Sequence, residues 1–438
     1  MDKIKTEFRR RMPDLVGYTK QKLMRDLGAG ITVGIVALPL SLALAIATGV
    51  PPILGLYTAG IAGFLAALFS GSAYSVSGPA AAMVPILAAI IQNYGLQQIP
   101  YITILAALML ITFALIGLGR YIHKVPESVI LGFTAGVAIV ILFGQLNNFL
   151  GLNGLEPHKH FAENAWETIT HLMSISLPVA IVGVLALLII LYAPKLKAIT
   201  KVPPTLIAVV VATLLVMFVP MFAGVPTLGS QFGALPLGFP SLNLGAFSLE
   251  HLLNRDLWFP AFQVAALIAI ESLLCAVVAD RLTKTKHRSN QELAAQGVAN
   301  LGSAVFGGIP ATAVIARTGT IIKAGAASRL ASMLHAAIVI AFIVALAPIA
   351  VNIPLSALSA VLIITAVRIS EYKEVAHFVR HKNWRLASVL MTTLVLTVFT
   401  DLVIGVSAGL ILHLAYRAHG QLRGRNRSDR LGESIASA

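Results

Sequence analysis

Two proline-containing motifs in an apolar background have the composition of an anion-binding site. In the first, Tyr74 to Ser77 favours extended backbone, Gly78-Pro79 breaks it, and helix-forming alanines follow. This order predicts a half-helix that begins at Pro79, because proline suits the first helical position. The free amide hydrogens and the positive dipole end of such a helix start favour an anion. The candidate binding residues here are Ser77, Gly78, Pro79, Ala80 and Ala81.

A second motif, Gly308 to Ala313, repeats this pattern in the other half of the chain. It predicts a second half-helix that begins at Pro310. Two half-helices aimed at each other near the membrane midplane would bind an anion through backbone donors. The alternative is that each proline kinks an ordinary helix. The candidate binding residues of this motif are Pro310, Ala311, Thr312 and Ala313.

Glu271 is the acid that stands well inside an apolar segment. Burying a charged residue there costs about 2.5 to 3.5 kcal/mol on insertion scales, so the carboxyl needs a partner, a proton or a function. We interpret Glu271 as a candidate proton carrier, with a hydrogen-bonded structural acid as the alternative. Sodium coupling competes with this interpretation, although the nearby Cys275 is a soft ligand that suits sodium poorly.

Arg317 and Gln263 complete the set of candidate site residues. Arg317 follows the second motif and would attract the anion, pair with Glu271, or anchor a helix end at the cytoplasmic surface. Gln263 lies two helical turns before Glu271, on roughly the same face, and is a candidate for polar lining. The sequence has no pair of ligands with metal spacing and no nucleophile and base arrangement, so neither a cofactor nor an enzyme is expected.

These motifs belong to an internal duplication. Gly60 to Gly71 and Gly297 to Gly308 align without a gap at an offset of 237 residues, with both terminal glycines and one phenylalanine in register. Each aligned stretch runs into one of the two proline motifs. Paired, Gly/Pro-interrupted apolar segments in two halves of a chain are typical of a transporter binding site.

The composition places the chain in a lipid bilayer. Hydrophobic residues make up 57% of the 438 residues and charged residues only 11%, which is more apolar surface than a soluble core can bury. Apolar runs predict fourteen spanning segments, several of them shorter than the roughly 20 residues of a straight spanning helix. They are expected at 27–48, 53–70, 74–93, 100–119, 126–148, 170–192, 203–220, 258–280, 291–306, 309–325, 330–349, 355–367, 386–400 and 402–416.

The net charge of +14 reflects membrane sidedness rather than nucleic-acid binding. If the amino terminus is cytoplasmic, nearly all basic residues fall on the cytoplasmic side, and only Lys159 and Arg255 lie outside. This sorting follows the positive-inside rule. We therefore expect a multi-pass protein of the cell inner (plasma) membrane with both termini in the cytoplasm.

Seven crossings in each half mean that the two repeats enter the membrane from opposite faces. The predicted fold class is an all-α polytopic membrane protein with 7+7 inverted repeats. Its expected parts are a basic cytoplasmic segment at 1–26, a first repeat at 27–220, an external connection at 221–257, a second repeat at 258–416 and a cytoplasmic tail at 417–438.

A series of short motifs, in order along residues 25 to 420, resembles the sulfate permease (SulP) family of anion transporters. The motifs are Val36 to Ala43, Gly49 to Pro52, Gly55 to Tyr57, Ser77 to Pro79, Asn290 to Leu293, Gln296 to Asn300, Gly307 to Pro310 and Ala316 to Thr318. Each is short, and their order and spacing together make the resemblance specific.

The resemblance implies a fold similar to uracil permease-type transporters, with segments 1–4 and 8–11 as a core domain and segments 5–7 and 12–14 as a gate domain. Substrate would bind between the short strands and half-helices of segments 3 and 10, and the core would slide against the gate like an elevator. Pro79 to Ala81 and Pro310 to Thr312 would form the anion cradle, Glu271 the core acid and Arg317 the basic group of segment 10.

Two departures from the family pattern bear on function. Many sulfate-type members have a glutamine where this chain has Leu40, which favours a dicarboxylate or bicarbonate over sulfate. The family also commonly ends in a cytoplasmic STAS domain, whereas this sequence ends in a short polar tail after a basic stretch.

The expected function is secondary active transport, by proton-coupled symport, of a small carboxylate-type anion such as the dicarboxylate fumarate. The alternatives are transport of bicarbonate or sulfate by sodium coupling or exchange, and a passive anion channel or uniporter. A nucleobase permease would require more side-chain hydrogen-bonding groups than the alanines of the two motifs provide. A homodimer enters only by analogy with the fold class.

Overall fold

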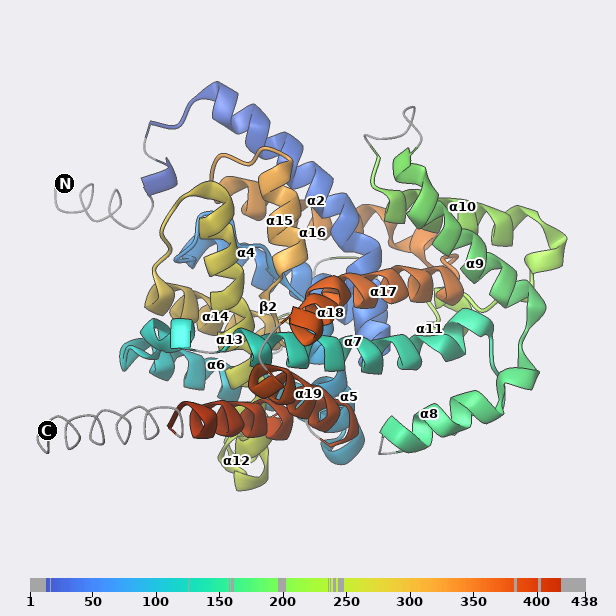
Figure 1. Ribbon diagram of the computed structural model, residues 1–438. Coiled ribbons are helices and arrows are strands. Elements are labelled where there is room, and N and C mark those ends of the chain that lie inside the picture. Colours follow the sequence, from blue (N-terminus) through green and yellow to red (C-terminus); the bar gives the residue numbers. More distant parts are fainter. Residues whose placement is uncertain are drawn as a thin grey trace, which may run out of the picture.

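The chain forms a bundle of apolar helices in which segments distant in sequence lie side by side, as the computed structural model shows (Figure 1). The structure describes residues 13–418 apart from 16, 125, 157, 159–160, 196–201, 235, 237, 239–241, 243–247, 382–383 and 401–402. Lys159 and most of the expected carboxy-terminal tail therefore lie outside the described residues. Among the described residues, seven helical stretches are long and apolar enough to cross a membrane.

Helical elements cover each of the fourteen predicted spans. Those of the first half are α2 (Lys20–Ala47), α3 (Pro52–Tyr57), α4 (Gly63–Phe69), α5 (Val84–Tyr94), α6 (Ile99–Leu115), α7 (Glu127–Leu150), α9 (Leu177–Tyr192) and α10 (Pro204–Phe218). Those of the second half are α13 (Trp258–Thr283), α14 (Ser289–Val305), α15 (Ile315–Lys323), α16 (Leu330–Ala350), α17 (Leu355–Ile369), α19 (Trp384–Phe399) and a last helix, Val403–Ala418.

Shorter helices connect the spans. They are α8 (Phe161–Thr170), α11 (Leu228–Phe232), α12 (Leu249–Leu253) and α18 (Tyr372–His381). Most of them precede a spanning helix of their own half, and α18 carries charged side chains on one face and buries Phe378 on the other. This alternation is typical of a helix that lies at a boundary between an apolar and a polar phase.

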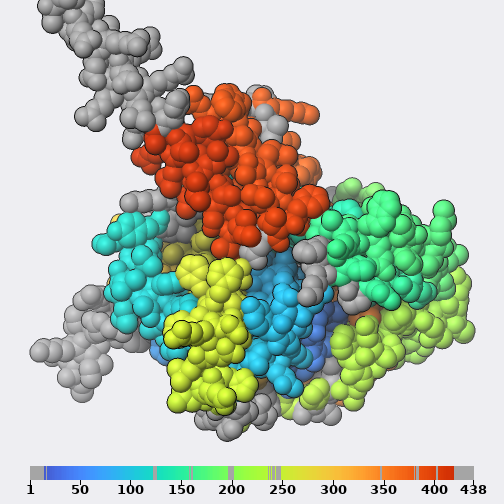
Figure 2. All heavy atoms as spheres, turned by 90° about the horizontal axis from the view of Figure 1, so that it is seen from below, coloured from blue at the N-terminus to red at the C-terminus, as the bar shows by residue number. Residues whose placement is uncertain are grey.

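The helices pack in two groups that match the expected core and gate. In one group α14 packs on α6 and α4, α16 packs on α2, and α13 packs on α6 and α15. In the other, α7 packs on α17 and α19, and α9 packs on α10 and α17. Helices of both halves contribute to each group, and the face of the molecule in Figure 2 carries segments of both halves, from blue to red. The two halves are therefore interleaved.

Small residues bring the helices of the second group close together. A Cβ atom on Gly132 of α7 would lie 2.4 Å from the carbonyl oxygen of Leu390, and one on Gly136 would lie 2.9 Å from Thr397. These two glycines are four residues apart, the spacing that lets membrane helices approach backbone to backbone. Lipid gives little hydrophobic drive between helices, so this close contact stabilises the pair through dispersion.

A two-stranded antiparallel ladder joins the two halves at the centre of the first group. Strand β1 (Ser77–Gly78) pairs with β2 (Thr312–Ala313), with Ser77 opposite Ala313 and Gly78 opposite Thr312. The pairing confirms that segments 3 and 10 are short strands followed by half-helices, and that the two proline motifs meet. Non-helical backbone at this depth is tolerated because protein buries it.

The predicted starts of the two half-helices are wrong. Pro79 and Ala80 are extended, with φ −122° and ψ 146° at Ala80, and the first helical turn begins at Ala81. In the second half Pro310 precedes its strand, and helix α15 begins five residues later, at Ile315. The two prolines are therefore not equivalent: one follows β1 and the other precedes β2.

Candidate functional site

The paired strands β1 and β2, together with the helix starts at Ala81 and Ile315, form a buried cradle. Ser77, Ala80, Ala311, Thr312 and Ala313 each expose 2% or less of their surface. In α15 the first helical hydrogen bond runs from the amide of Thr318 to the carbonyl of Val314. The amides of residues 315–317 therefore have no acceptor within that helix. Such amides are the donors that bind anions at helix starts.

Arg317 lies within this cradle and not at a membrane surface. Its side chain is 2% exposed, and Nη2 donates to Ser41 Oγ of α2 over 3.2 Å. Among the described residues, neither Nε nor Nη1 has a hydrogen-bond partner. This placement disfavours the interpretation of Arg317 as a surface anchor, and no ion pair joins it to Glu271 within the part of the chain that the structure describes.

The guanidinium of Arg317 also touches β1. A Cβ atom on Gly78 would lie 2.5 Å from Arg317 Nη1, so glycine at this position leaves the room that the guanidinium occupies. The single described partner of the guanidinium is a neutral hydroxyl. A buried cation that meets only neutral groups attracts an anion, because the low dielectric of the interior strengthens the interaction.

Glu271 lies on α13 beside the cradle. The residue is partly accessible, whereas its Oε2 atom is inaccessible and has no partner among the described residues. The next residue, Ser272, pairs its hydroxyl with Thr312 Oγ1 over 2.8 Å and accepts the amide of Ala313 over 3.1 Å. The residue that follows the acid on α13 therefore contacts β2. Gln263, two turns earlier, is buried on the same helix.

Cys275, the soft ligand expected to disfavour a sodium site, is engaged elsewhere. Its thiol donates to Thr318 Oγ1 over 3.1 Å, and the same hydroxyl accepts the amide of Val76 over 3.0 Å. Two side chains of α13, Ser272 and Cys275, thus attach that helix to β2 and to α15.

The sequence reasoning gave no role to a row of polar residues on α14. Glu292, Gln296 and Asn300 are spaced four residues apart and are fully buried. Glu292 accepts the hydroxyl of Ser70 over 2.5 Å and the amides of Gly71 and Ser72 over 3.0 and 3.2 Å. The four-residue spacing of acid and amide side chains within an apolar run was the signal that could have revealed this row.

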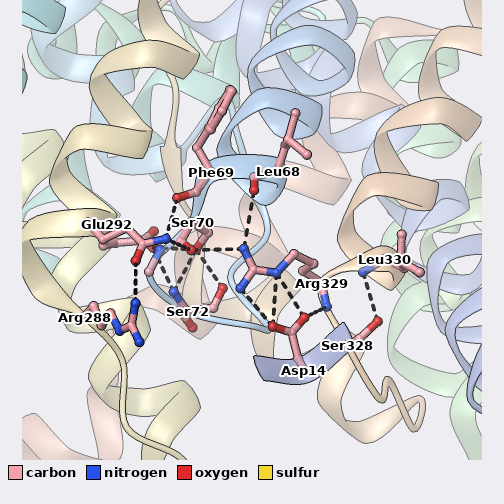
Figure 3. Close-up of polar contacts among 12 residues, drawn as sticks. Asp14, Leu68, Phe69, Ser70, Ser72, Arg288, Glu292, Ser328, Arg329 and Leu330 are labelled. Atoms are coloured by element: carbon pink, nitrogen blue, oxygen red, sulfur yellow. Dashed lines mark hydrogen bonds and ion pairs between the residues drawn. The ribbon is translucent and has the colours of Figure 1, made fainter. Parts of the chain in front are cut away.

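Figure 3 shows how this carboxylate and a nearby arginine hold the turn that leads into β1. Arg329, at the start of α16, donates from Nη1 to the carbonyl of Ser70 over 3.2 Å and from Nη2 to Asp14 over 2.9 Å. Both side chains of this ion pair are at least nine-tenths buried. The turn is therefore fixed by one acid from α14 and one cation from α16.

Asp26, in the first half of α2, joins that helix and Tyr18 to the loop before α16. Asp26 is fully buried and accepts the amide and hydroxyl of Ser328 and the hydroxyl of Tyr18, the last over 2.6 Å. Burial and the neighbouring Asp26 carboxylate raise the pKa of Tyr18 to about 12. Residues 14–26 are thus attached to the loop before α16 by two separate acids.

Comparison with known proteins agrees with this geometry. The model of the sulfate permease family matches residues 23–406. The chain belongs to that family. As a SulP protein it is a multi-pass membrane transporter of anions, and the resemblance seen in the sequence is confirmed.

Individual relatives cover nearly the whole chain. "Putative sulfate transporter YvdB" of Bacillus subtilis is 42% identical over 402 residues, which is 91% of this chain and 74% of the relative. "Bicarbonate transporter BicA" of Picosynechococcus is 30% identical over 398 residues, which is 88% of this chain and 69% of the relative. Both are named as transporters, in line with the expectation of a protein that is not an enzyme.

Solved structures show the same fold. The transmembrane domain of a cyanobacterial bicarbonate transporter BicA superposes with a TM-score of 0.77 at 30% identity, covering 89% of this chain and 98% of that one. Murine Slc26a9 in its inward-facing state gives a TM-score of 0.84 at 18% identity, covering 95% and 72%. The seven plus seven arrangement with core and gate domains is therefore confirmed.

Proposed function

We propose that this SulP protein transports a small carboxylate-type anion by proton-coupled symport, with the anion bound in the cradle between β1 and β2. The observation that carries the proposal is Arg317. This cation is buried, its one described partner is a neutral hydroxyl, and two of its nitrogens have no partner among the described residues. A bound anion would supply the missing acceptor and the opposite charge.

Charge balance gives a reason for coupling the anion to a proton. In the empty site, an ionised Glu271 would offset Arg317 and leave the region neutral. When a monovalent anion binds, protonation of Glu271 would keep the region neutral, since the anion then offsets the arginine. Moving a neutral region through a low-dielectric barrier costs much less than moving a net charge. The predicted stoichiometry is one proton, carried by Glu271, for each anion that binds with a single negative charge.

The walls of the cradle favour a compact oxyanion. The side chains of the two motifs are small alanines, Ala80, Ala81, Ala311 and Ala313, so the proposed donors are the guanidinium and the amides at the helix starts, which in α15 are those of residues 315–317. A carboxylate group suits such donors, as guanidinium and carboxylate form strong charge-assisted hydrogen bonds. Fumarate represents the dicarboxylates, and bicarbonate and sulfate, which occur in the names of relatives, are the competing substrates.

We propose alternating access by an elevator-like movement of the first helix group against the second. Support comes from the packing: β1, β2 and their half-helices belong to the first group, while α2 contacts α17 and α10 of the second. The cradle would then move with its own helices as a unit. The distribution of basic residues further supports placement in the inner membrane with both termini in the cytoplasm.

The test is uptake into liposomes that contain the purified protein, with labelled fumarate, bicarbonate and sulfate, each with and without an inward proton gradient. We expect accumulation of one carboxylate-type anion above its external concentration when the gradient is present. Uptake that only equilibrates, with or without the gradient, would refute symport and favour the channel or uniporter.

The role of Glu271 is tested in the same liposomes. Glu271→Gln is expected to transport at a rate that no longer depends on the proton gradient, because an amide cannot carry the proton. Glu250→Gln, an exposed acid on α12, is the matched control and should retain the dependence. If Glu271→Gln keeps the pH dependence of the wild type, Glu271 is a structural acid. A sodium gradient in place of the proton gradient tests the competing cation.

A further inference from the structure

The cradle strands are too short to hold themselves in place. Each has two residues, and among the described strands they pair only with each other. An isolated hairpin much longer than this is marginally stable at best, so a ladder of two residues needs other support. The backbone groups on the outer sides of the strands must also find partners, because they are buried.

Side chains of α14 supply much of that support. The carboxamide of Asn300 makes a reciprocal pair with Ala311, the residue before β2: the amide of Ala311 donates to Oδ1 over 2.8 Å, and Nδ2 donates to the carbonyl of Ala311 over 2.9 Å. This is the pattern by which a neighbouring strand would bind that residue. One turn earlier, Gln296 Nε2 donates to Ser77 Oγ of β1 over 2.8 Å.

We propose that Asn300 and Gln296 are positioning residues of the anion site, an inference that rests on the proposed function. Asn300 fixes the backbone just before β2, and α15, which carries Arg317, follows that strand after one residue. Gln296 fixes β1, which the guanidinium of Arg317 touches at Gly78. One helix therefore sets the separation between the arginine and the opposite half-helix.

The chemistry of the Asn300 pair requires a carboxamide. An asparagine both donates and accepts, whereas an aspartate only accepts when ionised and an alanine does neither. Asn300→Ala leaves an amide and a carbonyl of Ala311 without their partner, and the strand can then shift toward other donors or water. A misplacement of about 1 Å can cost a reaction about 100-fold in rate, and we expect an effect of up to that size on the affinity for the anion.

The experiment compares the KM and maximum rate of uptake of labelled fumarate, bicarbonate and sulfate, in liposomes of equal protein content, and uses whichever of the three the wild-type protein takes up. Asn300→Ala is expected to raise KM by about 10- to 100-fold with a maximum rate close to that of the wild type. Asn300→Asp should also raise KM, because it keeps the acceptor for the amide of Ala311 but loses the donor to the carbonyl of that residue.

Asn290→Ala is the matched control. Asn290 is the same residue type on the same helix, and its Oδ1 accepts one backbone amide, that of Gly119, over 3.0 Å at the other end of α14. We expect its KM to equal that of the wild type. If Asn300→Ala does not purify as a folded protein, the comparison of Asn300→Asp with Asn290→Ala replaces it.

An unchanged KM in both Asn300 variants would overturn the positioning role, as would a loss of maximum rate and thermal stability without a change in KM. The proposed function fails separately. If substitution of Arg317 also leaves the KM of the anion unchanged, the cradle is not the binding site. If substitution of Arg317 changes KM and substitution of Asn300 does not, the cradle remains the proposed binding site and the positioning role of Asn300 is refuted.

Discussion

Replacing Arg317 by methionine tests whether the guanidinium binds a ligand or stabilises the fold. Methionine has a similar length and no charge, so the substitution removes the guanidinium and largely preserves volume. A structural cation with good partners destabilises a protein when it is removed. Removal of a cation whose partner is a bound anion should not destabilise the anion-free protein, because burial of that cation is unfavourable when the anion is absent.

The contacts of Arg317 set the expected magnitudes. The variant loses the hydrogen bond to Ser41 Oγ, worth about 1.5 to 3 kcal/mol for a charged donor. It also removes a buried charge whose effective desolvation penalty is several kcal/mol. The two effects oppose each other, so the melting temperature without anion should equal or exceed that of the wild type. The anion loses at least one charge-assisted hydrogen bond, which corresponds to a rise in Kd of roughly 10- to 150-fold.

The assay is thermal unfolding of the detergent-solubilised protein, followed by tryptophan fluorescence at increasing anion concentration. For the wild type, an anion at 100 times its Kd adds about 2.7 kcal/mol to the free energy of unfolding. The same concentration should add only about 0.3 to 1.4 kcal/mol to Arg317→Met. Arg255→Met, which removes an exposed arginine of the external connection, is the matched control.

Two results would refute this reasoning. If Arg317→Met melts well below the wild type without anion, while Arg255→Met does not, the guanidinium has structural partners that outweigh its desolvation. If the variant retains the full stabilisation by the anion, the anion binds elsewhere. Either result would remove Arg317 from the proposed site.

Three further predictions concern the surroundings of the site. Gly78→Ala should raise the KM of the anion without unfolding the protein, because the new Cβ displaces the end of the flexible Arg317 side chain. In an Arg317→Met background the same substitution should have no added effect on KM, and an equal rise there would contradict the prediction. Asp14→Asn should lower the free energy of unfolding by up to about 3 to 5 kcal/mol, since it leaves Arg329 buried without its acid. An unchanged melting temperature would argue against a stabilising role of the ion pair. Tyr18 has a raised pKa of about 12, so its stabilising contact should persist below pH 10 and be lost between about pH 10 and 12. In a titration followed by tyrosinate absorbance, Tyr18→Phe should lose one late-titrating component of the wild type, and an unchanged titration curve would contradict the prediction.

Much of the architecture follows from local sequence patterns. Most predicted span boundaries agree with the helices to within a few residues. The largest differences are ten residues at the start of α5 and seven residues at the starts of α2 and α9. Both proline motifs were recognisable because glycine and proline close together disfavour a continuous helix. The duplication then predicted that the two motifs belong to one site. Each of these conclusions depends on neighbours in the chain or on a repeated string of residues.

The starts of the half-helices depended on contacts across the chain. Proline permits a helix start but does not require one. Pro310 and Ala311 stay extended because Asn300, 11 residues away, holds Ala311 and because the hydroxyl of Thr58, 251 residues away, accepts the amide of Ile309. These hydrogen bonds replace the ones that a helix would have provided.

By itself the sequence determined a duplicated, helical membrane protein with two broken segments, because hydropathy and Gly/Pro interruptions act locally. Tertiary structure alone decided the environment of each candidate residue. Arg317 is a buried cation because Ser41, 276 residues away, reaches its Nη2, and Glu292 is fully buried because the turn at Ser70 supplies its donors. A charged side chain in lipid or protein is stable only with such partners, and the local sequence does not specify which distant residues they are.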